Sequence, residues 1–286
     1  MHKWITLLLL ISTAHAITLT DDRQVSLNIT VAPQRIVTLL PSLAETVCVL
    51  GACDRLVGTD RYANWPESVK ALPKLGGLDD LQIESLVRLK PDLVLAPRSS
   101  RSIARLTQLG IPVLALEPQN QADVQRVIHI VAQALILPNA EQKANELWQT
   151  FVQAQASAKQ RVPLPMQGQS VYFEASTAGY VATEASFIGE LLKSLTLNNI
   201  VPSSLGSFPQ VNPEFVVRAN PQIIMIGETS VKDFTQRPGW SRIQAIQKKH
   251  VCTFTREQGD VLVRPGPRMM DAIDVLLNCL NQINHP

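Results

Sequence analysis

One local pattern occurs twice in this chain, 130 positions apart, and it constrains the fold more than any other feature. The first copy spans residues 84–96 and the second spans residues 214–226. In both copies Glu, Val, Arg and Pro recur in register, and an apolar run follows the proline. Each copy predicts a short helix, a proline stop and a buried strand. The repetition predicts two similar lobes, each presenting a glutamate, Glu84 or Glu214, early in the equivalent helix.

Strands and helices alternate through both halves of the chain. Apolar runs predict strands at 35–40, 56–59, 93–96, 113–116, 171–174, 223–226 and 251–254. The other helices are expected at 42–50, 103–109, 122–137, 186–195 and 268–280, with a turn into a short helix at 238–240. Such alternation is typical of parallel sheets covered on both faces. The expected fold class is therefore α/β, with two Rossmann-like lobes that contain mainly parallel sheets.

Two further sequence features predict a boundary between domains and the start of the first helix. Residues 139–161 contain no Gly or Pro, and Pro163 and Pro165 follow them, so one long linking helix is expected. The expected domains are a signal peptide (1–16), an N-terminal lobe (17–138), the linking helix (139–161) and a C-terminal lobe (162–286). The motif Ser42-x-x-Glu45 predicts a capping box at the start of the first helix.

The N-terminus has the features of a secretory signal peptide. Lys3 precedes an apolar stretch from Trp4 to Ile11, and 14–16 (Ala-His-Ala) has the form of a cleavage site, so cleavage is expected after Ala16. The first cysteine is Cys48, which argues against a lipid anchor, and no later segment is long and apolar enough to span a membrane. The mature chain of 270 residues has a formal charge of +1, which gives no general attraction to nucleic acid.

Four cysteines in an exported chain favour disulfides, for which three connectivities exist. The pairs Cys48–Cys53 and Cys252–Cys279 are favoured because each stays within one lobe. Buried, unpaired cysteines are the alternative. No cysteine or histidine spacing indicates a metal site.

In open parallel sheets, ligands bind beyond the carboxyl ends of the strands, and two-lobed proteins tend to bind between lobes. The residues that follow the expected strands are therefore candidates for ligand contacts: Tyr62, Trp65, Arg98, Glu117, Ser176, Glu228 and a loop at 256–264. Their mixture of aromatic rings and arginines suits a large, flat ligand with polar groups. No catalytic motif is present, so no catalytic residue is assigned.

Several short stretches together resemble the periplasmic binding proteins of ABC importers for corrinoids, haem and iron–siderophores, most of all the vitamin B12-binding proteins. The resemblance covers essentially the mature chain. It is carried by Pro41-Ser42-x-x-Glu45, Tyr62-x-x-Trp65-Pro66, Leu89–Val94, Asn198-Asn199-Ile200, Pro209-Gln210-Val211 and Arg264-Pro265-Gly266-Pro267-Arg268. It implies the class III fold, in which a single rigid helix joins two lobes. It also implies a monomeric periplasmic receptor that is not membrane-embedded, with the transmembrane subunits of an ABC permease as partner and a small-molecule metal chelate as ligand.

In that family, one glutamate of each lobe docks near arginines of the permease. The matching residues here are Glu84 and Glu214. The alternative is a role in helix stability, because each glutamate lies early in its helix and has an arginine, Arg88 or Arg218, four residues later.

The resemblance carries the corrinoid site over only in part. Tyr62 matches an aromatic residue of the cleft, and Phe208 matches an aromatic residue of the other lobe. Asp260 and Arg264 match residues that reach the amide-bearing edge of the ligand. Two further aromatic positions hold Leu78 and Pro97 instead, which leaves the exact ligand open.

The expected ligand is a cobalt corrinoid that the protein carries rather than uses, so no cofactor is assigned. A haem receptor, with Tyr62 as iron ligand, and a ferric-siderophore receptor, using Arg98, Arg256 and Arg264, are the alternatives within the class. From another class, an exported α/β hydrolase would require Ser176 or Ser186 to be hydrogen-bonded to a histidine.

Overall fold

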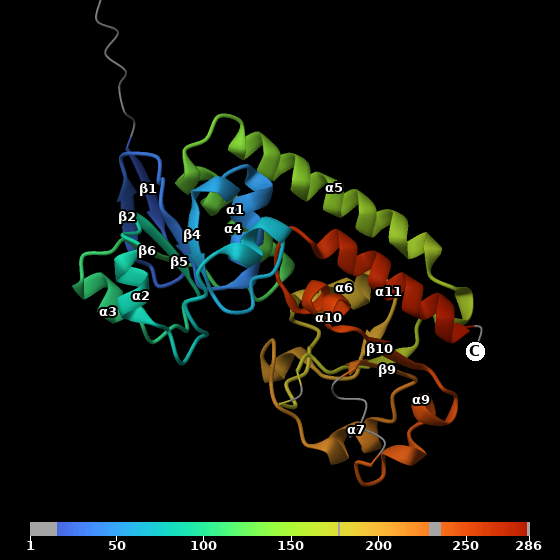
Figure 1. Ribbon diagram of the computed structural model, residues 1–286. Helices are drawn as coiled ribbons and strands as arrows, with labels where there is room; N and C mark the ends of the chain where they lie inside the picture. The colour runs from blue at the N-terminus through green and yellow to red at the C-terminus, as the bar shows by residue number, and fades with distance from the viewer. Residues whose placement is uncertain (1–15, 177, 229–235, 285–286) are drawn as a thin grey trace, which may run out of the picture.

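The computed structural model describes residues 16–176, 178–228 and 236–284. It contains two four-stranded parallel sheets with helices packed around them, and a long helix that connects them (Figure 1). None of the helices in these three ranges is both long enough and apolar enough to cross a membrane. The expected signal peptide lies outside the described residues except for Ala16, so its cleavage stays a prediction.

The N-lobe, residues 17–138, begins with an antiparallel hairpin that the sequence analysis did not anticipate. Residues 17–20 and 26–29 nonetheless alternate between apolar and polar side chains, which is the pattern of half-exposed strands. The elements of the N-lobe are β1 (Ile17–Thr20), β2 (Ser26–Ile29), β3 (Ile36–Thr38), α1 (Pro41–Leu50), β4 (Leu56–Thr59), α2 (Ile83–Arg88), β5 (Leu93–Ala96), α3 (Ile103–Gln108), β6 (Val113–Ala115) and α4 (Gln121–Leu135), with short 3₁₀ helices η1 (Cys53–Arg55) and η2 (Glu67–Ala71).

The linking helix α5 (Ala140–Arg161) leads into the C-lobe, residues 162–284. The elements of the C-lobe are β7 (Ser170–Phe173), α6 (Phe187–Ser194), β8 (Asn198–Asn199), α7 (Pro213–Ala219), β9 (Ile223–Gly227), α9 (Gln244–Gln247), β10 (Val251–Phe254), α10 (Arg256–Val263) and α11 (Met269–Asn284), with 3₁₀ helices η3 (Leu164–Met166), η4 (Ser203–Leu205) and η5 (Trp240–Arg242).

The two sheets share one topology. Their strand orders are β4-β3-β5-β6 and β8-β7-β9-β10, so in each lobe the first strand lies between the second and the third. All strand pairs in both sheets are parallel. The expected fold class, two parallel α/β lobes and a long helix between them, is confirmed.

The sequence repeat corresponds to matched structure. Glu84 and Glu214 are each the second residue of their helix, α2 or α7. Lys90 and Asn220 occupy equivalent positions after these helices, and both lie in the left-handed region with φ 47°. The backbone N–H of Asp92 then donates to Arg35 O at 3.0 Å, at the start of β3, and the equivalent Gln222 donates to Ser170 O at 2.9 Å, at the start of β7. The repeat therefore positions the helix and the third strand in both lobes.

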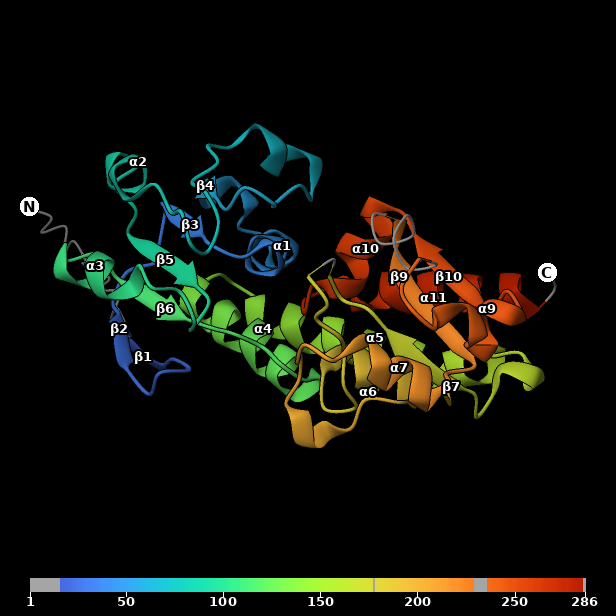
Figure 2. The ribbon, with the colours of Figure 1, turned by 90° about the horizontal axis from the view of Figure 1, so that it is seen from below.

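Helix α5 packs on both lobes at once. It contacts α4 and α1 of the N-lobe and α11 and α6 of the C-lobe, and α4 lies between the two sheets (Figure 2). At ~1.5 Å per residue, its 22 residues span about 33 Å. Its buried residues Ala144, Phe151 and Ala158 belong to one hydrophobic core with side chains of both lobes. The two sheets are thus joined by shared packing as well as by the chain.

Two expectations about helices are wrong. Ser42 caps no helix, because α1 begins one residue earlier, at Pro41, with Leu40 as the N-cap residue. Proline suits the first helical turn because its missing N–H would lack a partner there anyway. The segment 256–264 is also not a loop: its first eight residues form α10, which Thr255 and Gln258 start with a capping box.

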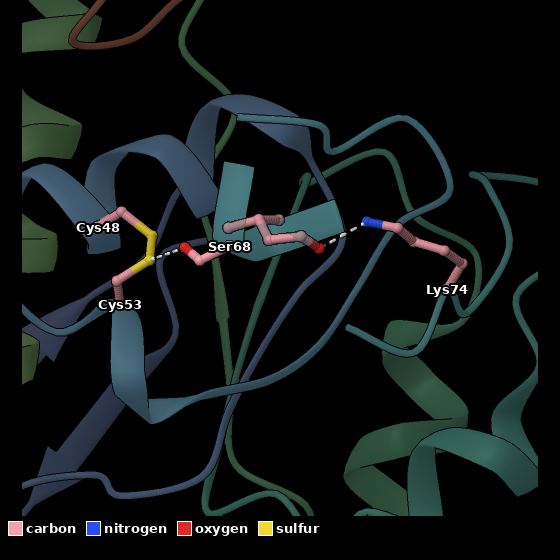
Figure 3. Close-up of a disulfide and its surroundings, with 5 residues drawn as sticks. Cys48, Cys53, Ser68 and Lys74 are labelled. Carbon is pink, nitrogen blue, oxygen red and sulfur yellow. Dashed lines mark hydrogen bonds between the residues drawn. A yellow bond between two sulfur atoms is a disulfide. The ribbon is translucent and has the colours of Figure 1, made fainter. Parts of the chain in front are cut away.

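Both favoured disulfides are confirmed, Cys48–Cys53 and Cys252–Cys279. The first joins the end of α1 to η1 and lies beside η2, where Ser68 Oγ is 3.6 Å from Cys53 Sγ (Figure 3). Each disulfide stays within one lobe, as expected.

Candidate ligand site and docking surface

Loops at the carboxyl ends of the N-lobe strands contact the C-lobe. The loop after β4 carries Tyr62, whose carbonyl accepts a hydrogen bond from Arg264 Nη2 at 3.0 Å. After β6, the carbonyl of Gln119 accepts from the backbone N–H of Phe187 at 2.9 Å. The strand ends where ligands are expected therefore lie at the junction of the two lobes.

Tyr62 presents its ring to solvent while its backbone is fixed. The residue is 57% exposed, and its N–H donates to Asp60 Oδ1 at 2.7 Å. Burial raises the pKa of Asp60 to about 6, although hydrogen bonding and the charges of Arg264 and Lys74 oppose the shift. An exposed aromatic face on an anchored loop suits contact with a flat ligand.

Lys74 holds this loop in place with three hydrogen bonds. Its Nζ donates to Thr59 Oγ1 at 3.0 Å, to Ala63 O at 2.6 Å and to Val69 O at 3.0 Å, which ties the loop to η2 beside the first disulfide (Figure 3). Burial lowers the pKa of Lys74, and the nearby carboxyl of Asp60 opposes this shift. The loop that carries Tyr62 is thus connected, through Lys74 and η2, to the first disulfide.

Arg264 lies at the centre of a polar group that spans the lobes. Its Nη1 donates to Glu45 Oε1 and to Asn64 Oδ1, both at 2.8 Å, and its Nη2 is 2.9 Å from Asp260 Oδ2. Asp260 Oδ2 also accepts from Asn64 Nδ2 at 2.8 Å. The guanidinium of Arg268 adds a longer contact of 3.5 Å to Glu45 Oε1. We call these five residues, Glu45, Asn64, Asp260, Arg264 and Arg268, the junction cluster.

Sequence reasoning missed the role of Glu45, which it assigned to a capping box. The side chain is 1% exposed, and its Oε2 has no hydrogen-bond partner among the described residues. Burial raises the pKa of this carboxyl, while Arg264 and Arg268 oppose the shift. No local signal could reveal this role, because the partner Arg264 is 219 residues away in the sequence.

The two remaining aromatic candidates are partly packed. Trp65 is half-buried, with Arg268 Cζ 5.1 Å from its ring centroid, so it joins Tyr62, Asp260 and Arg264 at the junction. Phe208 is also half-buried and packs on Phe187 with ring centroids 5.5 Å apart. No described contact joins Phe208 to the junction cluster.

Arg98 lies apart from that group. It is exposed, and its Nε is 3.9 Å from Glu117 Oε2, while Glu117 also accepts from Ser99. Arg98 and Glu117 line a hollow of about 450 Å³ at the carboxyl ends of β5 and β6, beside the β1–β2 hairpin.

The C-lobe has its own hollow of about 160 Å³ at the ends of β7, β9 and β10. Its polar side chains are mostly acceptors: the carboxylates of Glu174, Glu228 and Asp260 stand beside the single guanidinium of Arg256. Ser176 Oγ, also in the lining, is buried and has no hydrogen-bond partner in the described part of the chain. Arg264 does not line this hollow; its side chain is buried and pairs with Asp260, which does.

A second buried ion pair supports the hollow. Glu174 accepts two hydrogen bonds from Arg237, at 2.6 and 3.0 Å, and the guanidinium carbon lies 4.6 Å from the centroid of Trp240. The bond with Glu174 raises the pKa of Arg237, and burial together with Glu174 raises the pKa of Tyr172. No motif in the sequence indicated Arg237.

The two expected docking residues are exposed. Neither forms the expected pair with the arginine four residues later: Arg88 donates to Ser85 Oγ at 2.9 Å, and the described residues contain no ion pair between Glu214 and Arg218. The ion-pair part of the alternative role is therefore wrong, whereas the position of each carboxylate in the first turn of its helix, which the helix dipole favours, is as expected.

Neither serine of the hydrolase alternative contacts a histidine in the described ranges. Ser186 caps α6 by accepting from Gly189 N at 3.0 Å, and its hydroxyl donates to Thr183 O. Across the same ranges, no group of three His, Cys, Asp or Glu side chains is arranged to hold a metal ion.

Two parallel-sheet lobes, joined by one long helix and contacting each other at their strand ends, define a class of bilobed binding protein. The chain belongs to the periplasmic binding protein family, whose model matches residues 36–257.

The chain is similar in sequence to an ABC transporter substrate-binding protein and to vitamin B12-binding proteins. The chain is 28% identical to an uncharacterised ABC transporter substrate-binding lipoprotein of Bacillus subtilis, over 91% of this chain and 84% of the relative. It is 24% identical to the vitamin B12-binding protein of Pectobacterium atrosepticum, over 98% and 95%.

Solved structures agree with the fold. The periplasmic vitamin B12-binding protein of Vibrio cholerae superposes with a TM-score of 0.73 at 23% identity, covering 89% of this chain and 99% of that one. The periplasmic haem-binding protein of Roseiflexus gives 0.74 at 22%, covering 87% and 98%. At these identities the likeness shows the fold alone.

Proposed function

We propose that this protein is the periplasmic receptor of an ABC importer and binds a cobalamin-like corrinoid between its lobes. The expected signal peptide would direct export and be cleaved after Ala16, and the two disulfides suit an oxidising compartment. The family and the relatives named as vitamin B12-binding proteins support this assignment.

The acceptor-rich lining of the C-lobe hollow is the observation that carries the choice of a corrinoid. Asp260 pairs with Arg264, and the exposed Glu228 lies beside Arg256, so the hollow presents oxygen acceptors without a strong net charge, whereas the Glu174 carboxylate is buried against Arg237. The carboxamide N–H groups around a corrinoid can donate to these acceptors. The propionates of haem are ionised carboxylates, which have no N–H or O–H group to donate to these acceptors.

The size of this hollow requires a contribution from the other lobe. At about 160 Å³ it is smaller than the ~300–1,000 Å³ typical of pockets for drug-sized ligands. A corrinoid would therefore place one edge against Asp260 and Ser176 and rest its face on Tyr62. Trp65, Phe208, Arg98 and Arg264 stay in the proposal, with Arg264 acting through Asp260.

For delivery, Glu84 and Glu214 would dock on the transmembrane subunits of the permease. Both are exposed, both lie at the second position of equivalent helices, and neither carboxylate is in an ion pair among the described residues. Matched positions on two lobes suit one monomeric receptor that contacts a permease with two subunits.

A haem receptor is the second candidate, and Tyr62 favours it. Tyr62 is 57% exposed at the junction, so its hydroxyl would be accessible to the iron of a haem bound there. A siderophore receptor has less support, because Arg264 is buried in the junction cluster and Arg98 faces Glu117.

Titrations of the purified mature protein with cyanocobalamin, hemin and ferric siderophores, followed by absorption spectra and calorimetry, test the proposal. We expect one cyanocobalamin per chain, with affinity about tenfold weaker in Asp260→Asn because a charged hydrogen-bond acceptor is replaced by a neutral one. Asp274→Asn, an exposed C-lobe control outside the hollow, should bind as the wild type does. Binding of hemin alone, abolished in Tyr62→Phe, would refute the corrinoid assignment.

A further inference from the structure

The junction cluster contains direct polar contacts across the two lobes. Glu45 and Asn64 belong to the N-lobe, whereas Asp260, Arg264 and Arg268 belong to the C-lobe. Glu45 and Arg264 are nearly inaccessible to solvent, with side-chain exposures of 1% and 6%. Their contact is therefore shielded from the water and salt that weaken surface ion pairs.

Glu45 forms the ion pairs of the cluster that join one lobe to the other, with Arg264 and Arg268. Without it, Arg264 still has Asp260 as an ion-pair partner, and Arg268 still has Asp271 at 3.3 Å, both within the C-lobe. Loss of the Glu45 charge would thus leave each guanidinium ion-paired only within its own lobe, and the contact across the junction would rest on the neutral hydrogen bonds of Arg264 to Asn64 and Tyr62.

The same cluster holds the residues that face the ligand. Arg264 bonds the carbonyl of Tyr62 and the side chain of Asp260, which belong to opposite lobes. The relative positions of the loop after β4 and of α10 therefore depend on the guanidinium that Glu45 holds.

We propose that Glu45 is a positioning residue: by holding Arg264 and Arg268 across the junction, it fixes the angle between the lobes in the ligand-free protein. Tyr62 and Asp260 are then kept at a set separation before any ligand arrives. This inference does not depend on the identity of the ligand.

Pulsed electron resonance distances between the lobes test it in the ligand-free, full mature protein. Spin labels are attached through unnatural amino acids at Gln108 of α3 and Lys248 after α9, because all four cysteines are in disulfides. We expect a single narrow distance in the wild type and a wider, shifted distribution in Glu45→Gln, which keeps the shape of the side chain but not its charge.

Glu174→Gln is the matched control. It also removes a buried carboxylate from an arginine, but both partners lie in the C-lobe, so the distance between the lobes should not change. An equal widening in Glu174→Gln would show that general loss of stability causes the effect, and this result would overturn the proposal.

Asn64→Ala is a second test that alters no charge and serves if Glu45→Gln does not fold. It removes the hydrogen bonds of Asn64 to Asp260 and Arg264, so we expect a smaller widening in the same direction. Folded variants with the wild-type distribution would overturn the proposal. Because no ligand is used, failure of the corrinoid assignment in titrations would be a separate result.

Discussion

Replacing Asp60 with asparagine tests the electrostatics of the loop that carries Tyr62. Asp60 is 3% exposed, and burial raises its pKa from 3.8 to about 6. Between these two values the folded protein binds more protons at this site than the unfolded chain does. The contribution of Asp60 to stability is therefore complete below pH 3.8 and is lost as the pH rises through about 6.

The size of the effect follows from the shift. At ~1.36 kcal/mol per pKa unit, a rise from 3.8 to about 6 corresponds to about 3 kcal/mol of unfolding free energy. Asparagine does not titrate, so the Asp60→Asn variant should lack this loss and gain stability relative to the wild type as the pH rises.

Urea unfolding, followed by circular dichroism at several values between about pH 4 and 7, measures the difference between wild type and variant. Asp21→Asn is a control whose difference from the wild type should stay constant in this range. Burial alone would raise the pKa of Asp21, but Arg23 and backbone N–H groups lower it overall, so its stabilising contribution is complete above pH 3.8 and is lost only as the pH falls further. A difference for Asp60→Asn that does not change with pH, or that changes in the opposite direction, would refute the reasoning.

Three further predictions concern the disulfides, the second buried ion pair and the docking residues. Replacing Cys252 and Cys279 by serine should lower the unfolding free energy by about 3.5 kcal/mol, and replacing Cys48 and Cys53 by about 2 kcal/mol, because the sequence separations are 27 and 5; equal losses in urea unfolding would contradict this loop-entropy argument. Arg237→Met should cost about 3 kcal/mol by leaving Glu174 buried without a charge partner, and the double variant with Glu174→Gln should recover most of it in the same assay. Glu84→Arg combined with Glu214→Arg should abolish cellular uptake of labelled cyanocobalamin while its affinity for the purified receptor stays unchanged; normal uptake would exclude docking through these residues.

The repeat explains why so much of the fold could be predicted from the sequence. Short-range patterns, such as the apolar run after Pro91 and Pro221, determine strands that pair in the same order in both lobes. The segment 256–264 was misassigned because Gly259 interrupts a largely polar stretch, although the capping box of Thr255 and Gln258 was present in the sequence.

The candidate site was predictable only in part. Tyr62, Trp65, Asp260 and Arg264 do converge, because the loop after β4 and the helix α10 that follows β10 meet at the junction of the lobes. The partner of Arg264 was not predictable, since Glu45 matches a local capping motif and its burial depends on a residue in the other lobe. Whether these residues contact a ligand stays a prediction.

The shared packing on α5 has a consequence for cooperativity. Separate domains usually have separate cores and can unfold one at a time. Here a single core contains Val131 of α4, Phe151 of α5 and Leu276 of α11. The two lobes should therefore melt together in one calorimetric transition. Either lobe expressed without α5 would expose the apolar side chains that α5 covers in the whole protein.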